Sequence, residues 1–557
     1  AAEAPAAEEA PAAEEAPAEP APADGGPDAE EPAVGEEPAV AVEVEETSST
    51  GLEPIVRTYT QAEAMPLTED RITLTAWDYV VPPVMSVISD YGVDGQVYAE
   101  LQRRSGINFD FTTANLLTAS ENMSLMIAAD NLPDIIYDFG MFNTYSVDDL
   151  VGDEMIVNFR EYEDLMPNYF DILYNNPAII RALLTESGYI GYCANIQDTL
   201  IPSAGPAIRQ EWLDADGLDV PVTIADVDEV LHVFQVENNC QYPLFVSNLG
   251  VCSLSSAYGV NVGGQSSLGG WNYTNGEMEY CLPMEGFKQY VQLIADWYSE
   301  GLINPDFISS SNDSANPQVG DVINNGCGFF TSSVMGLTDY ASYEPESNIQ
   351  PIRRIVLNEG DLITSDDAGT NRVSKGGAAV ACSNPELEMS LQLMDYGYSD
   401  EGILLWNYGV EGVSFEYDEN GEPVLTELVT NNPDGIAFSA ALIKYTCATP
   451  ASICINERNF QGYNDAQLKA LTVWLRNGES EEAPGSLWTA EDQTEYSNLS
   501  TDLGSFVTTA VLQFMTGNRP MSEWDSFVDQ VMSSFDIDRM KELSEAAVER
   551  YMNLYQE

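Results

Sequence analysis

The sequence predicts an α/β fold that follows a long, acidic N-terminal linker. Short β-rich runs alternate with stretches of helical periodicity from residue 72 onward, and two amphipathic helices close the chain. The composition changes abruptly near residue 54. With 557 residues, of which 44% are apolar, the chain can bury substantial cores and is long enough for at least two domains.

Residues 1–54 form the predicted linker. They are rich in Ala, Glu and Pro, and residues 1–50 contain 15 acidic residues and no basic one. Such a segment cannot bury enough apolar surface to offset the entropy lost on ordering, and charge repulsion and proline extend it further. We therefore expect a disordered tether that holds a folded body away from a membrane. An unspecialised disordered tail is the simpler alternative.

The folded body opens with a β-α-β pattern. Residues 72–79 alternate apolar and polar side chains and predict a strand, a helix is predicted over 97–104, and a second strand follows through 107–111. A later apolar run predicts a short third strand within 132–138. Ligands of open α/β sheets bind beyond the carboxyl ends of the strands. The loops that end the first and third strands are therefore expected at one ligand-binding edge.

Later segments predict packed helices. Apolar and aromatic residues from Phe287 to Tyr298 have helical spacing, and Gly301 and Pro305 follow them as helix-ending residues. The same spacing continues through 524–535 and 537–555, which predicts a closing helix pair. We interpret these aromatic stripes as core packing.

Charge and hydropathy exclude several classes of partner. The 91 acidic and 20 basic residues give a formal net charge of -71, which repels nucleic acid and anionic membrane surfaces. No apolar run is long enough for a transmembrane helix, and residues 1–54 lack the basic and apolar regions of a signal peptide. We therefore expect a processed, exported chain whose contact with a membrane is covalent or goes through a partner.

The eight cysteines show no zinc-ligand spacing and no regular disulfide framework. We interpret most of them as buried free thiols. Cys447 and Cys454 are the best disulfide candidates because a short loop with Pro450 separates them, although two core cysteines are the simpler interpretation.

Four ordered segments resemble one family, the extracellular solute-binding proteins (family 1, carbohydrate type) of ABC importers, in the lipoprotein branch of Gram-positive bacteria. They are Met126-Ile-Ala-Ala-Asp-Asn-Leu-Pro-Asp-Ile-Ile136, Ile208-Arg-Gln-Glu-Trp-Leu213 with Gly217-Leu-Asp-Val-Pro221, Trp297-Tyr-Ser-Glu-Gly-Leu-Ile-Asn-Pro-Asp306, and a stretch from Asn384 through Tyr398-Ser-Asp-Glu-Gly402 to Asp418-Glu-Asn-Gly421. Their order spans residues 70–550. The acidity, the eight cysteines and the absence of a lipobox cysteine depart from the family pattern.

The resemblance implies a two-lobe, periplasmic-binding-protein-like fold of type II, the Venus-flytrap arrangement, after the linker. One lobe would comprise 70–190 with 370–410, and the other 191–369 with 411–557. It also implies a monomeric, lipid-anchored protein on the outer face of the cell membrane that captures an oligosaccharide and delivers it to a membrane permease.

A sugar site needs flat aromatic rings beside carboxylates, amides or arginine, since sugars present apolar faces and a rim of hydroxyls. The two strand-end loops supply such groups, and further candidates come from a glycine-rich stretch, from one of the few basic residues and from the segment expected to cross between lobes. The candidate ligand-binding residues are Trp77, Asp78, Tyr79, Tyr137, Asp138, Phe139, Arg209, Trp271, Trp406 and Tyr408.

The sequence offers little for catalysis. The single histidine, His232, lies in a predicted helix without a nucleophile motif, and no pair among the 91 acids stands out by spacing. Asp214-Ala-Asp-Gly-Leu-Asp219 lacks the distal ligands of a calcium loop and is interpreted as the end of a helix. We expect no cofactor, no metal and no enzymatic activity. A secreted carbohydrate-active enzyme and a surface adhesin with a vestigial cleft remain the alternatives.

Overall fold

The computed structural model describes residues 54–554 except 63, 81–87, 89–94, 117, 239, 247–253, 261–269, 275–276, 306, 308–318, 325, 338–339, 341–343, 345, 365–370, 448–449 and 479–484. The predicted linker up to residue 53, Cys252 and most of the glycine-rich stretch before Trp271 lie outside the described residues. Within them, no helix combines the length and the apolar character that crossing a membrane requires.

The first sheet has six strands in the order β13-β4-β10-β3-β1-β2. β1 is parallel to β2 and to β3, and a helix connects β1 to β2, so the predicted β-α-β opening is confirmed. The strands are β1 (Ile72–Val80), β2 (Ile107–Asn115), β3 (Ile135–Tyr137), β4 (Cys193–Gln197), β10 (Val373–Val380) and β13 (Ile453–Cys454).

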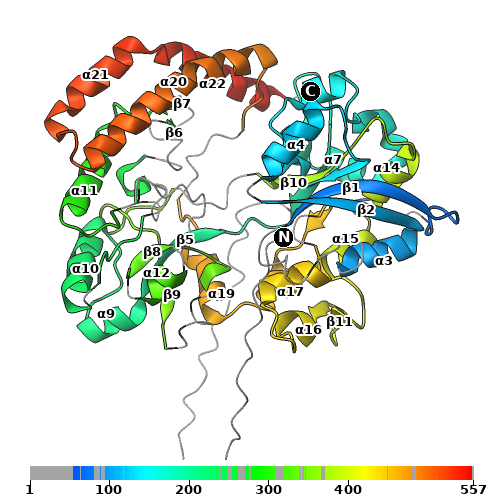
Figure 1. Cartoon of the computed structure of the whole chain (residues 1–557), viewed down its shortest axis with the longest axis horizontal. Coiled ribbons are helices and arrows are strands. Elements are labelled where there is room, and N and C mark those ends of the chain that lie inside the picture. Colours follow the sequence, from blue (N-terminus) through cyan, green and yellow to red (C-terminus); the bar gives the residue numbers. More distant parts are fainter. Residues whose placement is uncertain are drawn as a thin grey trace, which may run out of the picture. The chain divides into compact units, whose positions relative to one another are not determined.

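Helices cover this sheet and enclose three clusters of buried residues, two of which lie against opposite faces of β1. A small hairpin of β11 (Phe415–Tyr417) and β12 (Pro423–Leu425) confirms the turn predicted at Asp418–Gly421. The helices are α3 (Gln96–Ser105), α4 (Ala119–Ala128), α5 (Phe139–Phe142), α6 (Val147–Gly152), η1 (Phe159–Leu165), α7 (Pro167–Asn175), α8 (Pro177–Leu183), α14 (Leu387–Tyr396), α15 (Asp400–Tyr408), α16 (Glu427–Thr430) and α17 (Phe438–Tyr445) (Figure 1).

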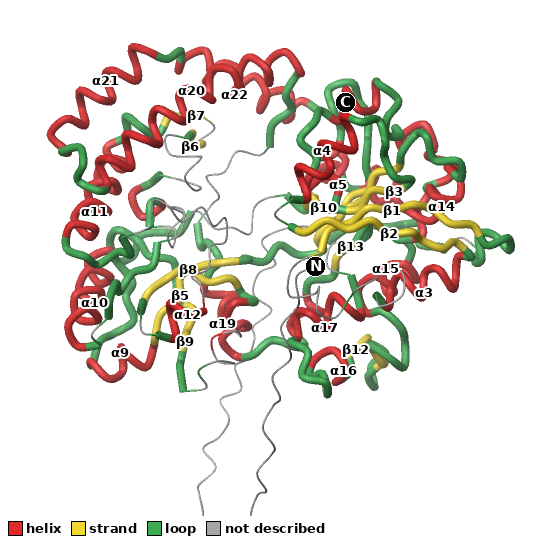
Figure 2. The backbone as a smooth tube through the Cα atoms, viewed as in Figure 1, coloured by secondary structure: helices red, strands yellow, loops and turns green. Residues whose placement is uncertain are grey.

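A second sheet has three strands in the order β8-β5-β9, and its strands gather apart from those of the first sheet in Figure 2. Its strands are β5 (Ala204–Arg209), β8 (Phe329–Ser333) and β9 (Ile349–Pro351), with a separate hairpin of β6 (Trp271–Thr274) and β7 (Glu277–Tyr280). The helices that pack with it are α9 (Gln210–Asp216), α10 (Ile224–Glu237), η2 (Ser256–Tyr258), α11 (Glu285–Ser299), α12 (Val319–Ile323), α19 (Asp465–Val473), α20 (Ala490–Met515), η4 (Met521–Glu523), α21 (Trp524–Ser534) and α22 (Ile537–Asn553).

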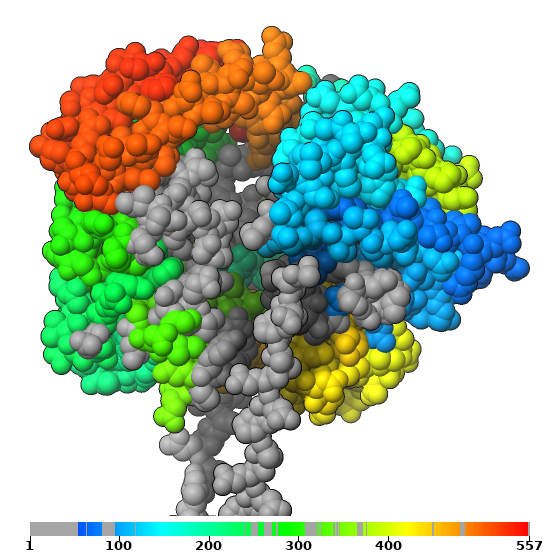
Figure 3. All heavy atoms as spheres, viewed as in Figure 1, coloured from blue at the N-terminus to red at the C-terminus, as the bar shows by residue number. Residues whose placement is uncertain are grey.

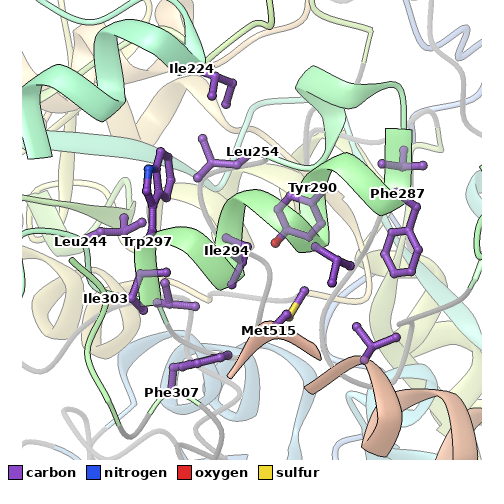
Figure 4. Packing of buried hydrophobic residues seen from close by; sticks show 14 of the residues in the cluster. Ile224, Leu244, Leu254, Phe287, Tyr290, Ile294, Trp297, Ile303, Phe307 and Met515 are labelled. Atoms are coloured by element: carbon purple, nitrogen blue, oxygen red, sulfur yellow. The ribbon is translucent and has the colours of Figure 1, made fainter. Parts of the chain in front are cut away.

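The core beside the second sheet is built on α11. Phe287, Tyr290, Ile294 and Trp297 project from one face of this helix into a single buried cluster, as Figure 4 shows, and α20, α21 and α22 contribute to the same cluster. In Figure 3 the side chains of these three C-terminal helices, in orange and red, form one layer next to α11 in green. The prediction that the aromatic stripes are core packing is confirmed.

The chain passes three times between the two sheets, and Asp198 lies where the three segments meet. The links are β4 to β5, β9 to β10, and β13 to α19 through α18 (Glu457–Phe460). The backbone N–H of Asp198 donates to Cys454 (3.0 Å), its carboxylate accepts from the backbone N–H of Asn456 (3.0 Å), and its carbonyl accepts from Arg372 Nη1 (2.5 Å). Asp198, which lies on the first crossing segment, therefore bonds to both of the other two.

Asn456 strengthens this junction. Its side-chain amide donates to Gln197 Oε1 at 2.8 Å and to the carbonyl of Thr199 at 2.7 Å, and the residue is buried. The amide thus holds the third crossing segment to both sides of Asp198.

The predicted lobe boundaries remain a prediction. Strand pairing, however, places one strand of the range 411–557 in the first sheet. β13 falls within 411–557, the range assigned to the second lobe, yet it pairs with β4 in the six-stranded sheet. The chain therefore passes from the first sheet for the last time after residue 454, because 455–464 leads to α19 beside β9.

The segment that leads into β1 is fastened to the first lobe. Backbone N–H groups of Val56 and Thr58 donate to Asn176 (2.9 Å) and Asp171 (2.6 Å), and Arg57 pairs with Asp400 (2.9 Å). The start of the described chain is thereby held on α7 and α15, before the amino end of β1.

All cysteines among the described residues are free thiols, and Cys193, Cys240, Cys281, Cys327 and Cys454 are buried. Cys447 and Cys454 do not form the candidate disulfide in this structure. The interpretation as mostly buried thiols is confirmed for the described cysteines.

His232 lies on α10, as predicted, and links it to the end of α11 through Nε2, 3.0 Å from Glu300 Oε2. A hydrogen bond to the Asp228 carbonyl, with the charges of Asp228 and Glu300, raises the pKa of His232. A histidine whose pKa is higher in the folded state stabilises the fold fully below its unfolded pKa, about 6.5, and loses that contribution as pH rises through the folded pKa.

His232→Gln should therefore lower stability at pH 5.5 by about 0.5 kcal/mol, a small value because the half-exposed side chain is screened by solvent, and should be neutral at pH 8.5. Urea unfolding of both proteins at the two pH values measures this difference. A deficit of the same size at both values would contradict the prediction. As the chain has one histidine, no other imidazole contributes.

Candidate functional site

The carboxyl ends of β1 and β3 bring the two predicted aromatic-acidic loops together. β1 and β3 are parallel with Trp77 opposite Ile136, so the next residues, Asp78 and Tyr137, continue side by side at the same edge of the sheet. Asp138 follows directly as the residue before α5. The expectation that both loops lie at one edge is confirmed, while ligand contact stays a prediction.

Asp78 is almost completely buried at this edge, with 6% of its surface exposed. Its Oδ1 accepts a hydrogen bond from the backbone N–H of Tyr79 at 2.7 Å, and its Oδ2 accepts from the Tyr98 hydroxyl at 3.4 Å. Asp138 is also buried, at 3% exposure, and holds a left-handed backbone with φ of 51°. Two acidic side chains therefore share a nearly water-free position.

Burial raises the pKa of Asp78 to about 7, and the hydrogen bonds from Tyr79, Asp138 and Tyr98 limit this rise. Burial, with the charges of Asp138 and Asp78, also raises the pKa of Tyr79. A carboxyl–carboxyl hydrogen bond requires that one group keeps its proton. One of the two carboxyl groups therefore carries the proton of the hydrogen bond between them.

Tyr98 organises the aromatic side chains around this pair. Its ring meets Tyr137 and Trp406 edge-on, each with centroids 5.4 Å apart, and Phe111 at 4.9 Å. Sequence reasoning missed Tyr98, because a tyrosine on the buried face of a helix looks like any core aromatic. No sequence signal shows that its hydroxyl points to Asp78.

Trp77 and Phe139 lie in the core rather than on a surface. Trp77 is 0% exposed, its Nε1 donates to Asn122 Oδ1 at 2.8 Å, and its ring meets Phe142 at 5.9 Å. Phe139 is buried in the same cluster. The period-two alternation of β1 explains this, since Trp77 faces the opposite side of the sheet from Asp78. Their contact with ligand stays an untested prediction.

Trp406 and Tyr408 are buried at the end of α15. Trp406 contacts Tyr98. Its Nε1 also lies close to Gly397, since a Cβ atom built on this glycine would stand 3.2 Å from that nitrogen. Tyr408 belongs to a separate cluster, where its ring lies 5.9 Å from Phe415. Only Trp406 is thereby connected to the Asp78 edge.

Arg209, at the end of β5, is 2% exposed and already paired. Its Nη1 donates to Glu211 at 2.8 Å, its Nη2 to Glu344 at 3.2 Å, and its guanidinium stacks over Trp212 at 4.9 Å. Ion pairs with two glutamates thus already engage its guanidinium, while contact with a ligand stays a prediction.

Trp271 opens β6 and is half-buried. Its Nε1 donates to the Tyr496 hydroxyl at 3.1 Å, its ring lies 5.4 Å from Tyr280, and Tyr496 in turn lies 4.9 Å from Trp488. A second aromatic group therefore consists of Trp271, Tyr280, Tyr496 and Trp488. Long sequence separation between residues 271 and 496 hid this group from sequence reasoning.

Comparison with solved structures shows which fold this is. The alginate-binding protein AlgQ2, in a crystal structure without calcium ion, superposes with a TM-score of 0.69 and 18% identity over 88% of this chain and 100% of its own. An HMO-binding solute-binding protein associated with an ABC transporter, from Bifidobacterium longum infantis, superposes with a TM-score of 0.67 and 16% identity. The match covers 87% of this chain and 99% of that protein. The substrate-binding protein FusA of an S. pneumoniae ABC transporter, in complex with kestose, superposes with a TM-score of 0.66 and 18% identity. The match covers 86% of this chain and 99% of FusA.

The chain therefore has the two-lobe fold of ABC-importer solute-binding proteins, which confirms the predicted fold class. No protein-family model matches the chain. No curated protein matches it either. At these identities the likeness concerns the fold.

The carboxyl pair leads to a prediction on stability. An acid whose folded pKa is raised binds its proton more tightly when folded, so stability falls as pH rises from the unfolded pKa near 4 to about 7 and stays reduced above it. Asp78→Asn removes this cost and should stabilise the protein by about 2–4 kcal/mol at pH 8.5 but little at pH 4.

Denaturant unfolding at both pH values checks this expectation. Asp400→Asn, at a mostly exposed acid, is the matched control and should show no such pH-dependent gain. Equal stability of wild type and Asp78→Asn at pH 8.5 would contradict the assignment.

Proposed function

We propose that this protein captures a neutral oligosaccharide outside the cell and delivers it to the membrane permease of an ABC importer. The observation that carries the proposal is the edge formed by Asp78, Tyr79, Tyr137 and Asp138 on a two-lobe solute-binding fold. Carboxyl groups beside aromatic rings suit the hydroxyls and apolar faces of a sugar. The similar structures include an alginate-binding protein, an HMO-binding protein and a complex with kestose.

Neutral sugars fit the charges at this edge better than uronic acids. The groups that perturb Asp78, Tyr79 and Tyr137 are carboxyls, phenols and thiols, with no basic group among those described. Arg209 is bound to two glutamates, and Arg458, buried near Trp406, donates to backbone carbonyls. An anionic sugar would meet two buried acids here.

We take Tyr79 as the residue of the first loop that touches the ligand, with Asp78 and Asp138 as hydrogen-bonding groups. Tyr79 is only half-buried, while Trp77 and Phe139 are covered. Trp271, in the aromatic group of the other lobe, is our second platform. Closure of the lobes on ligand would follow from its contact with both.

The linker supports attachment to the cell surface. An acidic, proline-rich segment of 54 residues precedes a chain that is bonded to α7 and α15 at its start. We propose that a lipid anchor precedes this tether and that the protein acts as a monomer on the outer face of the membrane. Mass spectrometry of the protein isolated from its native membrane tests the anchor.

The enzyme alternative finds little support at this edge. Carboxyl groups of glycosidases stand about 5–9.5 Å apart to flank the bond they cleave. Asp78 and Asp138 are instead in hydrogen-bonding contact. Release of products from any oligosaccharide by the purified protein would overturn a purely binding role.

A calorimetric screen tests capture directly. The panel contains kestose, maltotriose, cellotriose, xylotriose, a trimer of uronic acids and a tripeptide. We expect at least one neutral trisaccharide to bind and the uronic acid trimer not to. Absence of binding by every neutral member would favour the adhesin alternative.

Tyr79→Ala should weaken binding of that trisaccharide by about 1–3 kcal/mol if the ring packs on the sugar. Tyr174→Ala is the control, since Tyr174 is exposed on α7, and it should leave affinity unchanged. Equal affinities of Tyr79→Ala and wild type would reject the platform.

The junction at Asp198 predicts an effect on closure. Asn456→Ala removes two hydrogen bonds between crossing segments and should lower affinity several-fold, because a looser hinge loses more entropy on closing. Asn432→Ala is the matched control, a buried asparagine just after α16 that bonds locally to the Leu428 carbonyl. It should reduce melting temperature without changing affinity, and equal affinity losses in both variants would contradict a hinge role.

A further inference from the structure

The end of α22 links the two lobes through side chains rather than through a crossing of the chain. The guanidinium of Arg181, on α8, lies over the ring of Tyr551, on α22, at 5.8 Å from the ring centroid. Leu554, three residues further on, packs against the buried cluster that contains Ile180 and Leu183 of α8. Both contacts tie the end of α22 to the first lobe.

The helix that carries Arg181 belongs to the first lobe. α8 packs beside β10 of the six-stranded sheet, and its residues Ile179, Ile180 and Leu183 are buried in the main cluster of that lobe. The chain then runs from α8 into β4 of the same sheet. Arg181 therefore moves with the first sheet.

α22 itself is fixed to the second lobe. It contacts β7 and α20, and Met540 is buried in the cluster built on α11. The backbone N–H of Leu487 donates to the carbonyl of Ala547 at 2.9 Å. Arg550 Nη1 donates to the carbonyl of Leu487 at 3.1 Å, and the same side chain pairs with Asp492. The part of α22 that meets α8 is thus held by the segment that leads into α20.

Gly485 supports the ring of Tyr551 from the second lobe. A Cβ atom built on this glycine would stand 2.7 Å from Cζ of the ring, which is closer than a real side chain comes. Its φ of 122° also lies in the region that favours glycine. Because backbone packs directly against the ring, Tyr551 meets Arg181 from a fixed position.

The two contacts tolerate small movements of the lobes and are lost in large ones. A cation is attracted to a ring face within about 6 Å of its centroid, without a fixed bond direction. The apolar contact of Leu554 adds attraction that also falls off over a few ångströms. A hinge motion that swings the lobes far apart must therefore break both contacts, whereas a motion of limited range keeps them.

We propose that Arg181, Tyr551 and Leu554 form a clasp that limits how far the two lobes swing apart, and that this clasp raises the affinity for the captured oligosaccharide without touching it. The inference rests on the proposed function and adds a device that sets its affinity. The clasp is a fourth link between the lobes, besides the three crossing segments that meet at Asp198.

The effect on affinity follows from populations. Only free molecules whose lobes lie within reach of each other can close on a ligand, and the apparent affinity falls with the fraction of such molecules. A cation over an aromatic ring contributes about 0.5–1 kcal/mol at a partly exposed site, a factor of about two to five in that fraction. Loss of the clasp should lower affinity by this factor.

Hydrogen exchange measured by mass spectrometry tests the clasp without any ligand. In Tyr551→Ala and Leu554→Ala, the backbone amides of Asp198 and Asn456 at the crossing segments should exchange faster, because wider swings of the lobes open their hydrogen bonds. Amides of β1 and β2 should be unchanged. Unchanged exchange at the crossing segments, or faster exchange throughout the protein, would overturn the proposal.

Calorimetry with kestose, or with the tightest neutral binder of the panel, tests the effect on capture. Tyr551→Ala and Leu554→Ala should each bind about twofold to fivefold more weakly than the wild type. Asn553→Ala is the matched control, since this residue is exposed on the same turn, and it should keep wild-type affinity. Tighter binding by the two variants would show that capture breaks the clasp and would refute the proposal.

A double-variant cycle assigns the effect to the contact between the lobes. Arg181→Ala should weaken binding as Tyr551→Ala does, and the variant with both changes should bind no more weakly than either alone. Losses that multiply in the double variant would contradict a shared contact. Arg181→Lys keeps a cation and should retain part of the affinity.

The two kinds of measurement separate this inference from the proposed function. If no sugar binds while exchange at the crossing segments rises in the clasp variants, capture fails and the clasp between the lobes stands. If a sugar binds with equal affinity to the wild type, Tyr551→Ala and Leu554→Ala, capture stands and the role of the clasp fails.

Discussion

The junction at Asp198 is the constraint on which the two-lobe arrangement depends. Three segments connect the six-stranded sheet with the other lobe. Each is irregular, so its backbone N–H and C=O groups need hydrogen-bond partners outside a helix or strand. Asp198 meets these needs with its N–H, its carbonyl and its carboxylate, each bonded to a different partner. Because Arg372 and Asn456 come from the other two segments, no crossing can move without disturbing the junction.

This junction and the acidic edge lie on the same sheet. β4 and β13 run parallel to each other, and β1, β2 and β3 are parallel as well, with β10 antiparallel to both β3 and β4. The carboxyl ends of all five parallel strands consequently point to one edge. The Asp78 pair and the Asp198 junction share that edge, so a ligand that engages the first lies on the side of the sheet where the lobes are linked.

The protein has only 20 basic residues, and the arginines described near the lobe junction already have hydrogen-bond or ion-pair partners. Arg372 is bonded to a carbonyl, Arg209 to two glutamates, and Arg458 to the end of α15. Arginine retains its charge in the interior, and its planar group can satisfy several carbonyls at once. These arginines therefore hold backbone carbonyls and acidic side chains in place.

The sequence by itself determined the α/β class, the β-α-β opening, the helices of the closing segments and the edge at which the two loops meet. These properties follow from local periodicity and from the rule that parallel strands end at one edge, both of which are readable along the chain. The helical stripe from Phe287 to Tyr298 is an example, because its spacing alone defines the buried face.

Only the tertiary structure decided which side chains of those loops are available. Trp77 and Asp78 are neighbours in sequence, yet one lies in the core and the other lies against Tyr98 from α3. Likewise, β13 joined the first sheet, and Trp271 met Tyr496, through contacts between residues more than 200 positions apart. Such contacts depend on how whole elements pack, and no local pattern carries that information.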